Sequence, residues 1–348
     1  MAENGRRPGI VDVAARAGVS VGTASKALNG RGKLREETRA RVRLAAEELG
    51  FAPSSVARSL LSGRTYTVGI ITTDSYGRFS IPIMRGVEDA LGMGEISAFL
   101  CDTRDDAIRE QHHLRMLLAR QVDGIIIAGK RTEPRPPIAP AVPVPTVYAF
   151  ASSSSPDDCS VVSDEAGGAR AAIDHLVKTG RRHIAHITGP ASHGAATSRA
   201  GAAIAVLAGH GLQPVGDVWF GEWSESWGRL AAQALLGTHP EVDAVFCGSD
   251  QIARGVMDAL REGGRKLPDD VALVGMDNWG VFTEAARPRL TSVDLGLERV
   301  GRKSGELLLE AIAGNPQPGV HELPCRLVIR ESSAPRALPD LAARPGTR

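Results

Sequence analysis

The sequence predicts a small helical module at the N-terminal end, followed by an α/β body with two doubly wound parallel sheets. Three observations predict this fold class. Between residues 10 and 49, apolar residues recur at helical spacing in three short stretches. After Tyr66, short apolar strands alternate with amphipathic helices, which is typical of a parallel sheet covered on both faces. The strands fall into two series, which indicates two similar subdomains.

The composition is that of a globular chain. The 348 residues are 43% hydrophobic and 23% charged, enough for two or more cores, which excludes a disordered or fibrous protein. No apolar run reaches the roughly 18 residues of a membrane span, and residues 1–10 lack the apolar segment of a secretory signal, so we expect a cytoplasmic protein without a membrane partner. The cysteines are far apart, which predicts neither a zinc ribbon nor a disulfide framework: Cys101, Cys159, Cys247 and Cys325.

The net charge of +1 hides an asymmetry along the chain. Residues 1–60 hold eleven Lys and Arg against six Asp and Glu, whereas residues 61–348 hold thirty against thirty-four. A basic module joined to a nearly neutral body is expected of a nucleic-acid reader fused to a sensor or an enzyme. A basic segment that is merely solvated has the same charge balance.

The module at the N-terminal end contains three predicted helices. The first covers residues 10–17 and is ended by Gly18, and the second covers residues 21–28, with Ser20 as its N-cap. A third helix is predicted around residues 42–49. The apolar residues assigned to the three buried stripes are Ile10, Val13, Ala14 and Ala17, then Val21, Ala24 and Leu28, then Val42, Ala45, Ala46 and Leu49.

Two short helices joined by a three-residue turn have the geometry of a helix-turn-helix. In that geometry the second helix offers its N-terminal side chains to the major groove. A plain three-helix bundle would show the same stripes. The polar residues Thr23, Ser25 and Lys26, on the face of the second helix opposite its apolar stripe, favour the DNA reader.

The stretch IVDVAARAGVSVGTASKALNG, followed by EETRARVRLAAEELGFAPSSVARSLLSGRT, resembles the headpiece and hinge of the lactose repressor (LacI/GalR) family of bacterial regulators. It includes the D-V-A-x-x-A-G-V-S core, the L-N-G stop and the A-R-S-L hinge. The resemblance implies that Val21, Gly22 and Lys26 read bases. The residues that it implies as further DNA contacts are Ser20, Thr23, Ser25, Asn29, Ser54, Ala57 and Leu60.

Three positions carry specific expectations from this resemblance. Lys26 stands where the family usually has Arg, and a point charge without the planar fork discriminates guanine less well. Arg35 replaces a Ser that usually caps the third helix. By the resemblance, residues 54–61 form a hinge helix that folds against its dimer mate on DNA, and Leu60 wedges into the minor groove.

The body is expected to consist of alternating strands and helices. The predicted strands are Thr67–Thr72, Ile96–Cys101, Gly124–Ala128 and Thr146–Phe150, then His183–Thr188, Val218–Gly221, Ala244–Cys247 and Val271–Gly275. The predicted helices include Ile83–Leu91, Ile108–Arg120, Gly167–Lys178, Ser224–Leu236 and Gln251–Glu262. The Pro-rich stretch 134–145 and the serine run 152–155 are predicted to be surface loops.

We expect five segments in the domain organisation. They are the headpiece (1–52), the hinge helix and linker (53–65), an N-terminal effector subdomain (66–162 with 294–322), a C-terminal effector subdomain (163–293 with 323–332) and a flexible tail (333–348).

No enzymatic pattern is found in the sequence. There is no G-x-S-x-G, no H-E-x-x-H and no complete G-x-x-x-x-G-K-[ST], so we expect no catalytic residue, no metal and no cofactor. An enzyme regulated by DNA stays open as an alternative, since a nucleophile and a base brought together by folding would escape a motif search.

Residues suited to bind a ligand follow several predicted strands. Trp219, Trp223 and Trp227 fall within nine residues, and one of them is expected at a strand end, although all three could fill the core. Asp250 and Asp277 follow two predicted strands, at the sheet edge where ligands of parallel sheets bind, although Asp250 could instead cap a helix. An aromatic plane with acids and an arginine is suited to a sugar.

The segments VDGIIIAG, SDEAGGARAAIDHL, HIAHITGP, GEWSESWG, LPDDVALVGMDN and RPRLTSV resemble the effector domain of the same family, which is similar to periplasmic sugar-binding proteins. The resemblance implies that Arg199 clamps a sugar, that Trp223 stacks on it and that Asp277 binds its hydroxyls. It further implies pocket positions at Phe79, Ser80, Phe150, His193, Ser249 and Asp250.

Some of these positions depart from the family pattern. Ser80 replaces a frequent aromatic residue, Phe150 stands where Asp is common, and Ser249 replaces Asn. The loss of an aromatic clamp at Ser80 argues against a sandwiched purine, and the retained Arg199, Trp223 and Asp277 argue for a saccharide. A nucleobase or another non-sugar metabolite is the alternative effector.

These observations lead to one functional expectation. We expect a homodimeric transcriptional regulator, a repressor, that binds a near-palindromic double-stranded operator and responds to a small sugar held between the two subdomains. No leucine heptads follow residue 332, which favours a dimer over a tetramer. The alternative from another class is a sugar-binding protein without a regulatory role.

Overall fold

The computed structural model describes residues 8–28, 32–51, 64–92 and 96–334. By its internal contacts the chain divides into two compact units, and the boundary in the sequence falls between Thr67 and Val68. Asn29, Ser54, Ala57 and Leu60, with most of the expected hinge and tail, lie outside the described residues. Among the helices that are described, none is both long and apolar enough to cross a lipid bilayer.

The first unit contains the three expected helices, α1 (Ile10–Ala17), α2 (Val21–Leu28) and α3 (Glu36–Glu48). Gly18 ends α1 in the left-handed conformation, with φ of 65°, which glycine adopts without strain. The Ser20 hydroxyl accepts a hydrogen bond from the Thr23 amide at 3.2 Å, so the expected N-cap of α2 is confirmed. Arg35 makes no side-chain cap on α3.

Small residues form the core of this unit, where the three helices cross. The stripe expected for α2 is partly wrong, because Val21 is 43% exposed whereas Ala27 is 1% exposed. Ala24 and Ala27 are three residues apart, so they share the face that packs on α1 and α3. The buried residues are Val13, Ala14, Ala17, Ala24, Ala27, Val42, Ala45 and Ala46.

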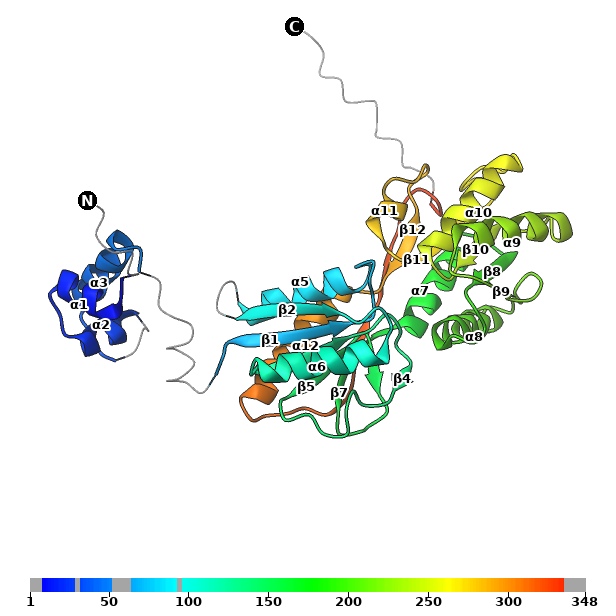
Figure 1. Cartoon of the computed structure of the whole chain (residues 1–348). Coiled ribbons are helices and arrows are strands. Elements are labelled where there is room, and N and C mark those ends of the chain that lie inside the picture. The colour runs from blue at the N-terminus through cyan, green and yellow to red at the C-terminus, as the bar shows by residue number, and fades with distance from the viewer. Residues whose placement is uncertain (1–7, 29–31, 52–63, 93–95, 335–348) are drawn as a thin grey trace, which may run out of the picture. The chain divides into compact units, whose positions relative to one another are not determined.

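The second unit is the body, which contains two six-stranded sheets (Figure 1). The first sheet has the order β13-β7-β5-β3-β1-β2. Its strands are β1 (Thr67–Thr72), β2 (Ser97–Asp102), β3 (Gly124–Ala128), β5 (Thr146–Ala149), β7 (Cys159–Asp164) and β13 (Gly319–Pro324). The central strands are parallel and in register, for example with Ile70 of β1 opposite Ile126 of β3.

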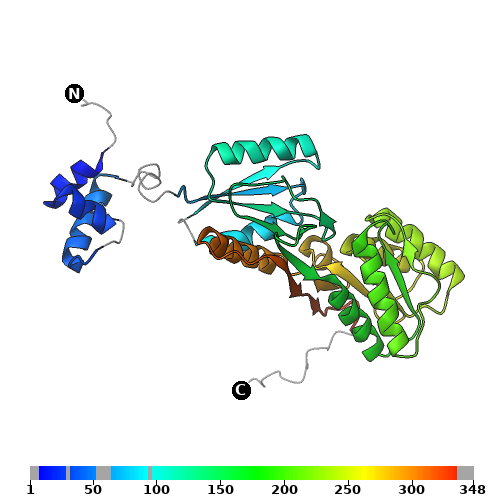
Figure 2. The same cartoon turned by 90° about the horizontal axis from the view of Figure 1, so that it is seen from below.

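Helices cover both faces of the first sheet (Figure 2). Side chains that alternate along β1 and β3 point to opposite faces, so Ile70 and Ile71 enter different cores. One core is closed by α5 (Ser80–Leu91) and α12 (Leu297–Ile312), and the other by α6 (Ala107–Ala119). This arrangement is the doubly wound fold that the sequence predicts.

The second sheet has the order β14-β12-β11-β10-β8-β9. Its strands are β8 (Ile184–Thr188), β9 (Trp219–Phe220), β10 (Ala244–Cys247), β11 (Ala272–Asp277), β12 (Thr291–Asp294) and β14 (Arg326–Val328). All its pairings are parallel except the one between β12 and β14. The helices α7 (Glu165–Lys178) and α8 (Gly194–Gly209) cover one face, and α9 (Glu225–Thr238) and α10 (Asp250–Glu262) cover the other.

Several expectations about the body are wrong in detail. The two series of four strands miss β7, β12, β13 and β14, which complete the sheets. The serine run is not an exposed loop, because Ser152 and Ser153 are buried and form β6, which pairs with β4 (Pro134–Arg135). Ser333, expected to begin a flexible tail, is 1% exposed and bonds to Thr291 at 2.7 Å.

The chain passes between the two sheets three times, each time within a few residues. It leaves the first sheet where β7 ends and α7 begins, returns between β12 and α12, and crosses again between β13 and β14. The crossings are neighbours, since the Ser163 hydroxyl donates to the carbonyl of Leu295 at 2.8 Å and Pro324 at the end of β13 lies opposite Asp164 at the end of β7. The two sheets are therefore joined along one narrow band of neighbouring backbone.

Candidate functional site

The exposed side of α2 is the candidate DNA-reading surface. Ser20, Val21, Gly22 and Lys26 are exposed, while Thr23 and Ser25 are half-buried. The hydroxyls of Ser20 and Thr23 lie 2.9 Å apart. All six residues that the sequence analysis assigns to DNA, among those described, therefore lie on α2 or at its N-cap, and Lys26 is in the last turn of the helix. The second helix of a helix-turn-helix reads the major groove.

The body contains a cavity of about 200 Å³ between the two sheets. Residues that follow the carboxyl ends of strands from both sheets line it, as expected for a ligand crevice of parallel α/β sheets. The lining consists of Arg78, Phe79, Lys130, Arg131, Glu133, Phe150, Glu165, His193, Ala195, Arg199, Trp223, Ser249 and Asp277. Seven of the nine residues assigned to the effector from the sequence lie in this lining.

Arg199 projects from α8 into the wall of the cavity and is 5% exposed. Its Nη2 donates to Oε1 of Glu165 at 3.0 Å, and its Nη1 donates to the carbonyl of Gly248. Burial raises the pKa of Glu165, and the Arg199 charge opposes that rise. Burial would lower the pKa of Arg199, but the carboxylates of Glu165 and Asp277 raise it above its ordinary value. The guanidinium is thus held charged and fixed in position.

Trp223 lies beside Arg199 and presents a ring to the cavity. The Arg199 guanidinium carbon lies 5.6 Å from the Trp223 ring centre. The indole Nε1 donates to Nδ1 of His193 at 2.8 Å, so neutral His193 carries its proton on Nε2. Gly189 permits this placement, because a Cβ there would lie 2.1 Å from the Trp223 ring. Trp219 and Trp227 pack, like Trp223, against the core of the second sheet, but they do not line this cavity.

Two phenylalanines form the wall that faces the first sheet. Phe79 and Phe150 stack with ring centres 5.4 Å apart and an interplanar angle of 17°. Phe150 has φ of 48°, a left-handed conformation that costs free energy for a bulky residue. Such strain persists only where the surroundings impose it, and it often accompanies a binding site.

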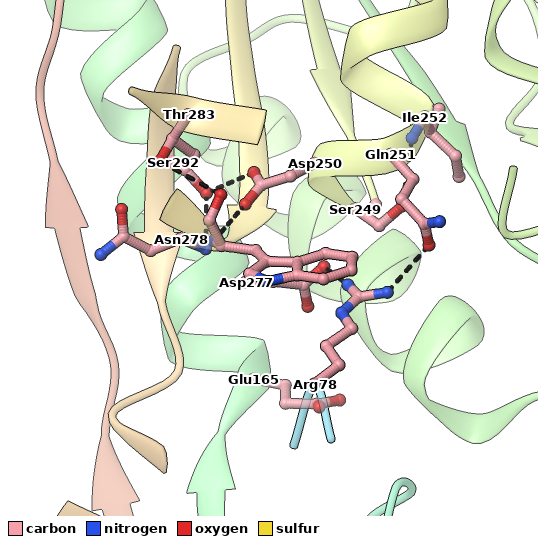
Figure 3. Close-up of polar contacts among 12 residues, drawn as sticks. Arg78, Glu165, Ser249, Asp250, Gln251, Ile252, Asp277, Asn278, Thr283 and Ser292 are labelled. Carbon is pink, nitrogen blue, oxygen red and sulfur yellow. Dashed lines mark hydrogen bonds and ion pairs between the residues drawn. The ribbon is translucent and has the colours of Figure 1, made fainter. Parts of the chain in front are cut away.

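Asp277, the last residue of β11, is linked across the cavity to Arg78, which precedes α5 (Figure 3). Arg78 pairs with the Asp277 carboxylate through Nη2 and donates through Nη1 to Oε1 of Gln251 at 2.9 Å. The Arg78 guanidinium also lies 4.9 Å and 5.0 Å from the ring centres of Phe79 and Trp279. The Arg78 guanidinium of the first subdomain is therefore paired with Asp277, the acid that by the resemblance binds a sugar hydroxyl.

The structure corrects two of the expected effector residues. Ser80 is 1% exposed, and its amide and hydroxyl donate to Asp74 at 2.9 and 3.2 Å, so it helps to fix the start of α5 and does not line the cavity. Asp250 is fully buried and accepts from the Ser292 hydroxyl at 2.6 Å and the Trp279 amide at 2.7 Å (Figure 3). The Ser80 hydroxyl is engaged by an acceptor of the protein and the Asp250 carboxylate by two donors.

Asp250 therefore supports the site without contacting its contents. Burial and the neighbouring Asp277 carboxylate raise the pKa of Asp250 well above its ordinary value. Its bond to Trp279 fixes the turn that follows Asp277. Helix α10 is capped by Ser249, whose hydroxyl accepts from the Ile252 amide at 3.2 Å, so the expectation that Asp250 could cap this helix is wrong.

Six residues of the lining were not predicted from the sequence. Lys130, Arg131 and Glu133 lie within five residues of the end of β3, and Glu165 directly follows β7. The rule that ligands bind at the carboxyl ends of parallel strands would therefore have found them. Arg78 gives no such signal, because it is 199 residues from its partner Asp277. Within the described ranges, no group of three or more His, Cys, Asp or Glu is arranged to hold a metal ion.

Comparison with known proteins agrees with the two units of the fold. The family described as bacterial regulatory proteins, lacI family, matches residues 9–54, and a periplasmic binding protein-like domain matches residues 173–333. The HTH-type transcriptional regulator CelR of Thermobifida fusca is 34% identical over 341 residues, covering 95% of this chain and 99% of that protein.

Two solved structures are similar over almost the whole chain. One is a transcriptional regulator CelR–cellobiose complex, with a TM-score of 0.66, 31% identity and coverage of 94% of this chain and 100% of that one. The other is the Lac repressor dimer bound to operator and the anti-inducer ONPF, with a TM-score of 0.72, 26% identity and coverage of 94% and 99%.

A helix-turn-helix unit joined to a periplasmic-binding-protein-like body defines a DNA-binding transcriptional regulator. The chain belongs to the lacI family of bacterial regulatory proteins.

Proposed function

We propose that this regulator is a homodimer that represses transcription from a near-palindromic operator and that a small saccharide, bound in the cavity between the two sheets, controls its affinity for DNA. The observation that carries the proposal is the convergence of Arg199, Trp223 and Asp277, from three separate elements, on one cavity. An arginine fork, an aromatic face and a carboxylate together recognise the hydroxyls and the apolar face of a sugar ring.

The DNA half of the proposal depends on α2. Val21, Gly22 and Lys26 are exposed along this helix, and Ser20 and Thr23 place two hydroxyls at its N-terminal end. We assign base reading to the first three residues and phosphate contacts to Ser20, Thr23 and Ser25. One such helix contacts only a few base pairs, so a useful specificity ratio needs two copies on a twofold site.

The control half depends on the two walls of the cavity. Phe79 and Phe150 belong to the first subdomain, and Arg199, Trp223 and Asp277 belong to the second. A ligand that contacts both walls favours one spacing of the subdomains over others, and its differential affinity is the free energy available for control. The CelR complex contains cellobiose, which makes that disaccharide a reasonable first probe here.

Two measurements on the full-length protein test the proposal. Fluorescence anisotropy with labelled duplexes from a randomised pool reports sequence-selective binding at about 0.15 M salt, where non-specific binding is weak. Intrinsic tryptophan fluorescence reports ligands, since Trp223 lines the cavity. Cellobiose, monosaccharides and nucleobases are titrated with and without the selected duplex.

We expect a saturable fluorescence change with a saccharide and a shift of operator affinity in its presence. Arg199→Lys is expected to abolish the response but not operator binding, because lysine lacks the planar fork. Selective DNA binding that responds only to nucleobases would refute the saccharide, and the absence of sequence preference would refute the regulator.

A further inference from the structure

The cavity has more hydrogen-bond donors than acceptors left for a ligand. Within the described part of the chain, the buried Nε atoms of Arg78 and Arg199 have no hydrogen-bond partner, although both arginines are paired through their terminal nitrogens. Arg131 is exposed at the cavity and makes no hydrogen bond or ion pair within the same ranges. An arginine side chain has only hydrogen-bond donors, so the unpartnered nitrogens of these three arginines can be satisfied only by acceptors.

The acids of the cavity are already engaged by protein donors. Asp277 is paired with Arg78, and Glu165 with Arg199. Oε1 of Glu133 accepts from the Gly194 amide at 2.6 Å, at the N-terminus of α8, where a negative charge is stabilised by the helix dipole. Only Oε2 of Glu133 is buried and unpartnered among the carboxylate oxygens described at this cavity. A neutral sugar, whose hydroxyls must both donate and accept, would therefore compete with protein donors for the carboxylates of Asp277 and Glu165.

Arg78 is central to this imbalance because of where it lies. It comes from the first subdomain, it is 14% exposed in its side chain, and it holds the Asp277 carboxylate of the second subdomain. A neutral ligand that displaces Arg78 from the Asp277 carboxylate would leave the Arg78 guanidinium without a counter-charge in a mostly buried place. A ligand with its own negative charge can replace Asp277 as the partner of Arg78 and leave no cation unpaired.

We propose that the effector is an acidic saccharide, whose carboxylate or phosphate is bound by Arg78 and Arg131, while Oε2 of Glu133 accepts from one of its hydroxyls. This inference rests on the proposed function, because it names the chemical class of the ligand in the same cavity. Arg78 is thereby the specificity-determining residue that selects an acidic sugar over its neutral parent. Charge-assisted hydrogen bonds of this kind correspond to about a tenfold to hundredfold preference.

Matched ligand pairs test the proposal by tryptophan fluorescence and calorimetry on the full-length protein. The pairs are glucuronate with glucose, galacturonate with galactose, and glucose 6-phosphate with glucose, and inorganic phosphate is a further probe. We expect saturable binding of at least one anionic probe, at least about tenfold tighter than its neutral parent. The carboxylate and phosphate arms show which anion the site takes.

Substitutions assign the preference to the cavity. Arg78→Gln is expected to reduce the acidic preference to within about threefold, and Arg131→Gln to reduce it in part. Arg85→Gln on α5 is the control, because Arg85 is exposed and outside the cavity. Thermal unfolding of each variant verifies that it is folded. If Arg78→Gln does not fold, Arg131→Gln still tests the proposal.

The outcomes separate this inference from the proposed function. No saturable response to any anionic probe overturns the acidic class, and neutral sugars that still bind and shift operator affinity leave the proposed function standing. An acidic preference that survives Arg78→Gln and Arg131→Gln, or that Arg85→Gln removes equally, also overturns the assignment. A loss of all ligand responses and of selective DNA binding refutes both.

Discussion

Replacing Arg199 with methionine removes a buried cation and leaves its partner Glu165 behind. Both side chains are 6% exposed, and Nη2 and Oε1 lie 3.0 Å apart, so the Glu165 carboxylate loses its charged partner in a poorly solvated place. The carbonyl of Gly248 loses a donor at the same time. Removing one partner of a buried ion pair costs about 3 to 5 kcal/mol, so we expect Arg199→Met to lower the free energy of unfolding by that amount at pH 7.

The loss is expected to depend on pH with a definite sign. Burial raises the pKa of Glu165, and without the opposing charge of Arg199 this pKa rises further. An acid whose pKa is higher in the folded than in the unfolded state loses its proton first in the unfolded chain, so stability falls as the pH rises above the unfolded value of about 4.3. The variant should therefore be closest to the wild type near pH 4 and fall behind at neutral pH.

Urea unfolding, followed by circular dichroism at one fixed protein concentration, measures this loss at several pH values. Glu165→Gln and the double variant complete the cycle, and the double variant is expected to regain at least half of the stability lost by Arg199→Met. A loss below about 1 kcal/mol, or a double variant as unstable as Arg199→Met, would refute the buried ion pair as the source of the effect.

Three further predictions concern separate parts of the molecule. Lys26→Ala should lower discrimination at one operator base pair by about 1 to 3 kcal/mol, measured by competition with single-base variants. Gly228→Ala should lower the free energy of unfolding by about 1 to 3 kcal/mol, because a Cβ there would lie 2.1 Å from the carbonyl oxygen of Ile252 and push α9 away from α10. Burial lowers the pKa of His186 to about 4, so the unfolded chain gains a proton first as the pH falls below about 6.5. The free energy of unfolding should therefore drop by about 3 kcal/mol between neutral pH and pH 4. His186→Gln should flatten this pH dependence, as measured by urea unfolding. Three matched controls, each a residue of the same type in an exposed or unobstructed position, are expected to show none of these losses: Lys33→Ala, Gly237→Ala and His183→Gln.

Local signals determined the parts of the fold that the sequence predicts well. Gly18 and Ser20 mark helix ends by their own backbone and hydroxyl chemistry, and the apolar runs of β1, β3 and β10 are found with the bounds expected. The strands that were missed are defined by distant partners. β13, for example, alternates half-buried and exposed residues at a sheet edge and is set by pairing with β7, about 160 residues earlier in the chain.

The same distinction holds for the candidate site. Arg199, Trp223 and Asp277 were predicted because a family pattern marks each of them, and the cavity brings them together. Ser80 and Asp250 carried the same kind of mark, but sequence does not show that Asp74 and Ser292 consume their polar groups. Arg78 was missed because its importance arises only from an ion pair across the cavity.

The three crossings between the sheets have a mechanical consequence. Because they lie side by side, the subdomains can turn about the line through them at little cost, while sliding or separating them would stretch several backbone segments at once. Glu165 is the first residue after one crossing, and it forms an ion pair with Arg199 in the cavity wall. A bound molecule that displaces the Arg199 guanidinium therefore also acts on the hinge between the subdomains, through the Glu165 side chain alone.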